Sequence, residues 1–222
     1  MSPSSAAGFL GRDSARGDAA RRAAARRRGA ARRRGALLGL SVLVALIVVV
    51  LAMPLFRSAV NHFALPLTNQ DIIRQQAAEK HLDPALIAGV IYAETKFDPR
   101  PSPAGAQGLM QILPQTAEFL AKRSGATTFT TADLATPQVN IAYGSYYLRY
   151  LLDEYGGSRV LALAAYNGGE ANVSRWLRSA RAQGRDFRTG DIPFLETRAY
   201  VRKVLNAQAE YRRTYATELG YR

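Results

Sequence analysis

Residues 83–95 read Asp-Pro-Ala-Leu-Ile-Ala-Gly-Val-Ile-Tyr-Ala-Glu-Thr and have the pattern of a buried helix. Asp83 is a good N-cap residue because its side chain can accept a hydrogen bond from a free N–H of the first turn, and Pro84 fits the first helical position. The apolar side chains recur at helical spacing, at Leu86, Ile87, Val90 and Ile91. The stretch therefore predicts a helix that packs into the core of a helical domain.

Glu94 lies three residues after Ile91 and four after Val90, so it continues this apolar stripe. A carboxyl group on a buried face loses hydration, which disfavours its charged form and raises its pKa. Such a carboxylic acid stays protonated near neutral pH and can act as a general acid. The alternative is an ordinary surface glutamate at a helix end, and the spacing alone leaves both interpretations open.

Helix signals continue on both sides of this stretch and predict an all-α domain over residues 69–215, followed by a C-terminal tail at 216–222. Capping residues, prolines at first helical positions and glycines after last turns mark the helices. No strand alternation and no internal repeat accompany them. The predicted helices cover residues 69–80, 83–95, 114–122, 137–155 and 158–166, a short segment around Trp176, and 194–215.

The first 68 residues differ in composition from this domain. Residues 1–35 contain ten Arg, two Asp and almost no large apolar side chain, so we expect a disordered basic tail. No charge occurs from Gly35 to Phe56, and a helix over these 22 residues spans ~33 Å, the thickness of a bilayer core. Residues 36–56 are therefore predicted to form one transmembrane helix, and residues 57–68 a linker.

The arginines at 32–34, directly before the apolar run, should stay on the cytoplasmic side, so the helical domain should lie outside the cytoplasm. A cleaved signal peptide is the alternative, but the apolar run is long for one and no clear small-x-small cleavage site follows it. An Arg-rich tail could bind nucleic acid. Next to a membrane anchor it serves better to fix orientation and contact anionic lipid, so we expect no nucleic-acid partner.

The absence of cysteine excludes a disulfide framework, a zinc–thiolate site and a cysteine nucleophile. A Ser-His-Asp triad or a histidine metal site would need His62 or His81, and neither has a companion motif. We therefore interpret both as surface residues.

Two glycine-rich segments carry groups suited to binding sugars. Residues 103–112 read Pro-Ala-Gly-Ala-Gln-Gly-Leu-Met-Gln-Ile. The glycines permit tight turns and close approach of backbone to a ligand, Met110 offers an adaptable apolar contact, and the glutamines match sugar hydroxyl and acetamido groups. Residues 164–169 read Ala-Ala-Tyr-Asn-Gly-Gly and place an aromatic ring beside an amide at a helix end.

Four motifs, in order, resemble the catalytic domain of the soluble-type lytic transglycosylases, which share the goose-type lysozyme fold. The resemblance extends from about residue 68 to 215. The motifs are Glu94-Thr95, residues 106–112, Ala165-Tyr166-Asn167, and residues 192–201, which read Ile-Pro-Phe-Leu-Glu-Thr-Arg-Ala-Tyr-Val. Three departures affect subsite detail: Thr95 where Ser is usual, Phe97 where Trp is common, and Gly168-Gly169-Glu170 where Ala-Gly-Pro is ordinary.

The resemblance implies an all-α, lysozyme-like domain that binds the glycan strands of peptidoglycan, with Glu94 as its catalytic acid and base. It implies cleavage of the β-1,4 bond between N-acetylmuramic acid and N-acetylglucosamine with 1,6-anhydro ends, and neither a cofactor nor a metal. The residues implied to bind substrate or support the site are Thr95, Gln107, Gly108, Leu109, Met110, Gln111, Tyr166, Asn167, Glu196 and Tyr200.

Two other functions remain open at this point. A hydrolase on the same fold normally needs a second carboxylate as base or nucleophile. Asp98, Glu170 and Glu196 are the candidates, and Glu196 is the best of them because turn formation and helix capping explain the other two. A non-catalytic peptidoglycan-binding scaffold is the second alternative, although a scaffold has no need of a buried acid.

Overall fold

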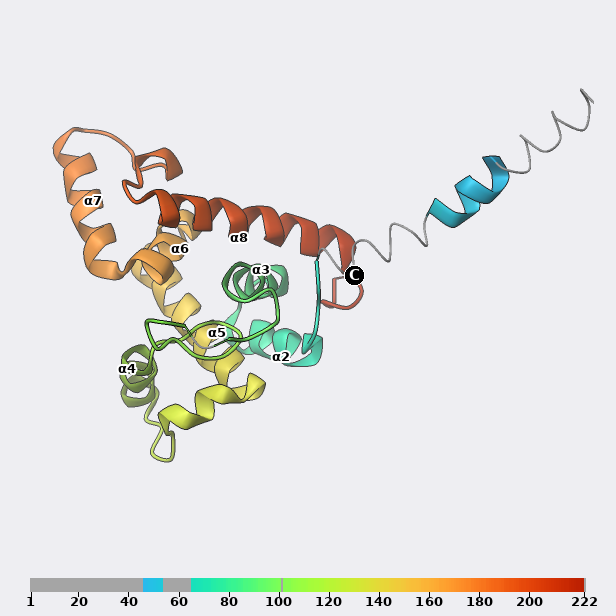
Figure 1. Ribbon diagram of the computed structural model, residues 1–222. Helices are drawn as coiled ribbons and strands as arrows, with labels where there is room; N and C mark the ends of the chain where they lie inside the picture. Colours follow the sequence, from blue (N-terminus) through green and yellow to red (C-terminus); the bar gives the residue numbers. More distant parts are fainter. Residues whose placement is uncertain (1–45, 54–64, 101, 222) are drawn as a thin grey trace, which may run out of the picture. The chain divides into compact units, whose positions relative to one another are not determined.

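The computed structural model describes residues 46–53, 65–100 and 102–221 (Figure 1). Residues 46–53 are helical with exposed side chains and form part of a unit separate from the domain that follows. Within the described residues, no helix combines the length and apolar character needed to cross a membrane. The predicted tail (1–35), most of the predicted anchor (36–45 and 54–56) and linker residues 57–64 lie outside the described ranges.

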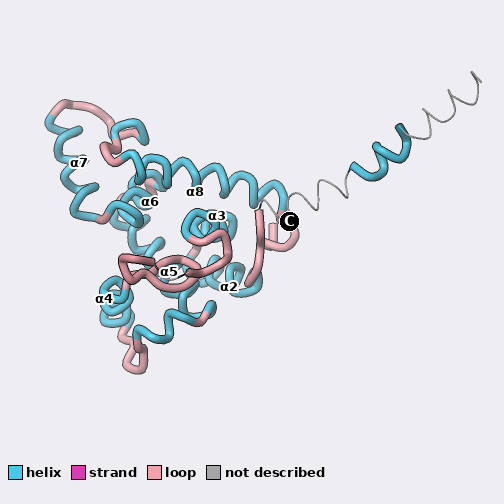
Figure 2. Tube along the Cα trace, viewed as in Figure 1, coloured by secondary structure: helices cyan, strands magenta, loops and turns pink. Residues whose placement is uncertain are grey.

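The domain consists of helices joined by loops, as predicted, and its described residues contain no strand (Figure 2). Each predicted helix is present. The helix around Trp176 is longer than expected, and two short 3-10 helices were not predicted. The elements are α2 (Gln70–Lys80), α3 (Pro84–Glu94), α4 (Pro114–Ser124), η1 (Thr131–Ala135), α5 (Pro137–Glu154), α6 (Arg159–Gly168), α7 (Glu170–Ala182), η2 (Thr189–Asp191) and α8 (Leu195–Thr214).

Side-chain caps explain the starts of two helices, α3 and α6. The Asp83 carboxylate accepts a hydrogen bond from the Ala85 N–H at 3.0 Å and so caps α3. Ser158 caps α6 in the same way. The start of α2 differs from the prediction, because Asn69 has a left-handed backbone (φ 55°) and its side chain makes no cap. Its amide group instead donates to the Thr68 hydroxyl at 3.0 Å.

The predicted helix at 83–95 is buried as expected. Every residue from 85 to 91 is buried, and α3 packs mainly against α8, which crosses it (Figure 1). The two backbones approach closely at Gly89, where a Cβ atom would lie 3.0 Å from the Val204 carbonyl oxygen. Since α3 ends at Glu94, its packing against α8 decides where that carboxyl group lies.

The segment after α8 also belongs to this core. Leu219 is buried, and the Tyr221 hydroxyl donates to Asp83, the cap of α3. The same carboxylate accepts hydrogen bonds from Gln208 at 2.6 Å and Arg212 at 2.7 Å, both on α8. The packed domain therefore continues past residue 215 to Tyr221, into the segment predicted as a tail.

Candidate active site

The loop at 102–112, between α3 and α4, has a tightly constrained backbone. Gln107 and Ile112 exchange two backbone hydrogen bonds of 3.0 Å, and Gly108 and Gln111 between them have left-handed φ values of 71° and 48°. The Gln111 amide donates to the carbonyl oxygens of Gly108 at 2.9 Å and Arg100 at 3.2 Å. The loop is therefore held in one conformation largely by its own polar groups.

A buried asparagine of α5 fixes this loop to the core. The Asn140 side-chain oxygen accepts from the Met110 N–H at 2.8 Å, and its nitrogen donates to the carbonyl oxygens of Gln107 at 2.8 Å and Leu134 at 3.0 Å. The close approach requires glycine at 108, because a Cβ there would lie 2.1 Å from the Asn140 nitrogen. Asn140 was not predicted, since nothing in the sequence around it distinguishes it from a surface residue.

Two hydroxyl groups attach the loop to neighbouring helices. The Thr95 hydroxyl lies 2.9 Å from the Leu109 carbonyl oxygen, and the Tyr166 hydroxyl of α6 donates to the Met110 carbonyl oxygen at 2.9 Å. The side chains of Leu109 and Met110 are only 3% and 0% exposed. They pack in the core and line neither the Glu94 pocket nor the pocket beside it, so contact of these two side chains with substrate stays a prediction.

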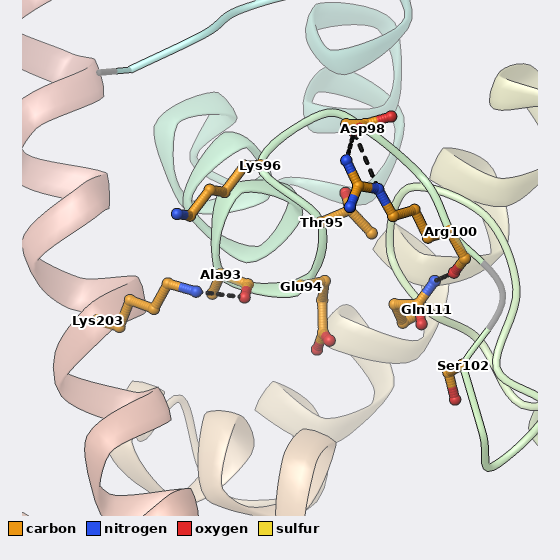
Figure 3. A pocket seen from close by; sticks show the side chains of 9 residues that line it. All are labelled: Ala93, Glu94, Thr95, Lys96, Asp98, Arg100, Ser102, Gln111 and Lys203. Carbon is orange, nitrogen blue, oxygen red and sulfur yellow. Dashed lines mark hydrogen bonds and ion pairs between the residues drawn. The ribbon is translucent and has the colours of Figure 1, made fainter. Parts of the chain in front are cut away.

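Glu94 is the last residue of α3, and its carboxyl group opens into a pocket of about 490 Å³ (Figure 3). Burial raises the pKa of Glu94 to about 7, while the Tyr200 hydroxyl and the positive charge of Lys203 lower it in part. At neutral pH a large fraction of this carboxyl group is therefore protonated. The expectation from the apolar stripe, a raised pKa at Glu94, agrees with this environment.

Two buried tyrosine hydroxyl groups lie close enough to Glu94 for its charge to affect them. Burial, reinforced by the nearby Glu94 charge, raises the pKa of both Tyr166 and Tyr200 well above the usual value. The Tyr200 oxygen is buried and forms no hydrogen bond of normal geometry with the described residues. Both phenols stay protonated, and that of Tyr200 is free to donate to Glu94 when the carboxyl group ionises.

The other predicted residues divide into two groups. Thr95 and Gln111 line the Glu94 pocket, and Gln107 and Gly108 line an adjoining pocket of about 450 Å³ that shares Arg100 and Ser102 with it. Asn167 is exposed, accepts a hydrogen bond from Thr197 at 2.7 Å and lines neither pocket. Glu196 is likewise exposed, in the first turn of α8, and lines neither pocket.

The family model "Transglycosylase SLT domain" matches residues 71–187, more than half of the chain. The chain belongs to the transglycosylase SLT family. The helical, lysozyme-like fold of this family agrees with the predicted all-α architecture.

Individual members of the SLT family show the extent of the similarity. The chain is 34% identical over 151 residues to the soluble lytic murein transglycosylase of Escherichia coli K12, which covers 66% of the chain and 23% of the relative. It is 31% identical over 166 residues to membrane-bound lytic murein transglycosylase C of Edwardsiella ictaluri, covering 64% of the chain and 46% of the relative. The chain therefore spans less than half the length of either protein.

A solved structure shows the same similarity in three dimensions. An inactive glutamate-to-glutamine mutant of the lytic transglycosylase Slt from Pseudomonas aeruginosa superposes with a TM-score of 0.64 at 31% identity. The match covers 70% of this SLT chain and 26% of the Pseudomonas chain.

Several residues that line the Glu94 pocket of this SLT domain were not predicted, among them Lys96, Ser102 and Lys203. One signal could have identified Lys203: it lies three residues after Tyr200 on the same helix and so shares its face. Lys96 carried no such signal, because its direction depends on the turn after α3.

The raised pKa of Glu94 predicts a pH-dependent effect on stability. The folded protein binds the Glu94 proton more tightly than the unfolded chain does. This tighter binding adds to the free energy of unfolding; the contribution is complete below about pH 4.5 and is lost as pH rises through about 7. Glutamine carries no charge at either pH. We expect Glu94→Gln to raise the free energy of unfolding by up to about 3 kcal/mol at about pH 8 and to change it little at about pH 4. Urea denaturation at both pH values measures this, and equal differences at the two would contradict it.

Proposed function

We propose that this chain is a peptidoglycan lytic transglycosylase that cleaves the β-1,4 bond between N-acetylmuramic acid and N-acetylglucosamine and leaves 1,6-anhydromuramoyl ends. The observation that carries the proposal is the Glu94 carboxyl group, which is partly buried, has a pKa of about 7 and opens into a pocket. The names of its relatives as lytic murein transglycosylases support the same reaction.

The proposed reaction needs one carboxyl group in two roles. Protonated Glu94 donates its proton to the glycosidic oxygen as the bond to C1 of the muramoyl residue breaks. The acetamido group of that sugar shields the positive charge at C1, as in substrate-assisted glycosidases. The Glu94 carboxylate then accepts the proton of the C6 hydroxyl group, and O6 bonds to C1. Glu94 is protonated again at the end, and no water is consumed.

Hydrolysis would need a second carboxylate beside Glu94, and the surroundings of the three candidate side chains do not favour this role. Asp98 lies in the pocket but forms an ion pair with Arg100 at 2.7 Å. Glu170 accepts a hydrogen bond from Tyr150 at 3.1 Å. Glu196, the best candidate from the sequence, is exposed outside the pocket. Each of the three thus has another partner or lies outside the pocket, which supports a reaction without a second carboxylate.

Mass spectrometry of the products tests the proposal directly. Purified peptidoglycan digested by the full chain is expected to yield muropeptides with 1,6-anhydromuramoyl ends, each lighter by one water molecule than the reducing-end form. Chemical reduction with borohydride provides the control, because it modifies reducing ends and leaves anhydro ends unchanged. Products that are mainly reducible would identify a hydrolase, and binding without any cleavage would identify a scaffold.

We further propose that residues 36–56 anchor the enzyme in the cell membrane by a single helix, with the N-terminus cytoplasmic and the catalytic domain outside the cytoplasm. The support comes from the sequence: an uncharged apolar run of sufficient length follows three arginines. That a relative is named a membrane-bound lytic murein transglycosylase is consistent with such an anchor.

A further inference from the structure

The pocket around Glu94 contains more positive than negative charge. Lys96, Arg100 and Lys203 all line it (Figure 3). Arg100 is paired with Asp98, whereas neither lysine forms an ion pair with a carboxylate among the described residues. Because the pKa of Glu94 is about 7, this carboxyl group is only partly ionised at neutral pH and compensates the two positive charges only in part.

Contacts hold the Lys203 side chain in place, and the turn after α3 sets the position of the Lys96 backbone. The Lys203 ammonium group donates to the Ala93 carbonyl oxygen at 2.6 Å and lies 5.7 Å from the centre of the Tyr92 ring. Lys96 has a left-handed backbone with φ 52°, which is unfavourable for a residue with a side chain. In Figure 3 both ammonium groups lie on the side of the α3 end that faces α8, and Glu94 lies between them and Gln111.

The turn that places Lys96 is itself stabilised by packing. Phe97 also has a left-handed backbone, with φ 65°, and its ring packs against Tyr211 of α8 with 5.9 Å between ring centres. Two consecutive left-handed residues persist only where the surroundings hold them. Partial burial and the charge of Lys96 lower the pKa of Lys203, which indicates that the two like charges lie near each other. Like charges held together in this way favour an anion between them.

We propose that Lys96 and Lys203 form a subsite for a substrate carboxylate next to the bond that is cleaved. This inference rests on the proposed function. Peptidoglycan offers such a group from two sources: the lactyl group of a muramoyl residue without peptide, and the carboxylates of a peptide stem. Lys203 also binds the last turn of α3 through the Ala93 carbonyl, whereas the Lys96 side chain makes no hydrogen bond with the described residues. A substitution of Lys96 therefore tests ligand binding without removing a hydrogen bond that supports the fold.

Three substrates and two variants test the subsite. The substrates are glycan strands with peptide stems, strands stripped of stems by an amidase and so carrying free lactyl carboxylates, and stripped strands whose carboxylates have been converted to neutral amides. The variants are Lys96→Gln and Lys96→Gln/Lys203→Gln in the full chain. Lys122→Gln/Arg181→Gln removes two positive charges from exposed positions on α4 and α7 and is the matched control.

We expect Lys96→Gln to raise KM about five- to tenfold on at least one carboxylate-bearing substrate, with kcat changed by less than about twofold. The double variant should show a larger increase, Lys96→Arg should restore KM, and the control should match wild type. Added salt should raise the wild-type KM and have little effect on the double variant. An effect confined to stem-bearing strands identifies the stem as the source, and one confined to stripped strands identifies the lactyl group.

Two results would overturn the subsite while the proposed function stands: an unchanged KM on both carboxylate-bearing substrates, or an equal loss on the neutral amidated strands. The second would show that the lysines act on the structure and not on a carboxylate. If the wild-type chain released no product from any strand, the proposed function and the subsite would fall together.

Discussion

Glu94→Gln is expected to slow the cleavage of purified peptidoglycan by about a thousandfold. Glutamine keeps the shape of the side chain and its place at the end of α3, but it has no acidic proton to give to the glycosidic oxygen. It also cannot accept the C6 hydroxyl proton in the second step. Because one carboxyl group performs both steps in the proposed reaction, no other pocket residue replaces it. The initial rate of anhydro-muropeptide release measures the effect.

The matched control for this change is Glu118→Gln, which makes the same substitution at an exposed position on α4. It should cleave at the wild-type rate. A Glu94→Gln protein that is folded, as shown by circular dichroism and thermal unfolding, and that still cleaves at more than about a tenth of the wild-type rate, would remove Glu94 from its proposed role.

Gly108→Ala is expected to lower the free energy of unfolding by about 3–5 kcal/mol. The added Cβ would lie 2.1 Å from the Asn140 side-chain nitrogen and 2.6 Å from the Leu134 carbonyl oxygen. Asn140 must then move, and its three hydrogen bonds to the loop and to η1, two of them fully buried, are lost. The left-handed φ of 71° adds a further cost of about 1–2 kcal/mol. Urea denaturation monitored by circular dichroism measures the loss.

Gly105→Ala separates the two causes. Gly105 has a similar φ of 79°, but a Cβ there meets no atom within 4 Å. We expect this variant to lose only about 1–2 kcal/mol, the cost of the backbone conformation alone. Equal losses for the two variants would mean that the contact with Asn140 does not require glycine at 108.

The helical architecture was predictable because its signals are local. Asp83 and the prolines at 84, 114 and 137 begin helices through the chemistry of a single turn, and each of these helices begins where predicted. The raised pKa of Glu94 was also accessible, since the apolar stripe of one helix indicates which face is buried. Asn69 shows the limit of this reasoning, because a suitable cap residue adopted a backbone that prevents capping.

The remaining parts of the site depend on which helices pack against one another, and local sequence patterns do not indicate this. Leu109 and Met110 sit in the motif that borders the pocket, yet their side chains face the core. The backbone of this loop is held by Asn140 of α5, Tyr166 of α6 and Thr95, the residue after α3. Lys203 contributes to the pocket only because α8 crosses α3. Contacts between residues this distant in sequence are absent from any local pattern.

The contacts between α3 and α8 determine when the Glu94 site can form during synthesis and folding. At one end Asp83 binds Arg212, 129 positions later in the chain, and at the other Ala93 binds Lys203, 110 positions later. Contacts of such long separation form late, because a long loop must close before they contribute. During synthesis α3 emerges well before α8. A domain that still lacks α8 also lacks the contacts that position the Glu94 carboxyl group. Under the proposed function, this chain can therefore cleave glycan only after the whole domain has been synthesised and folded.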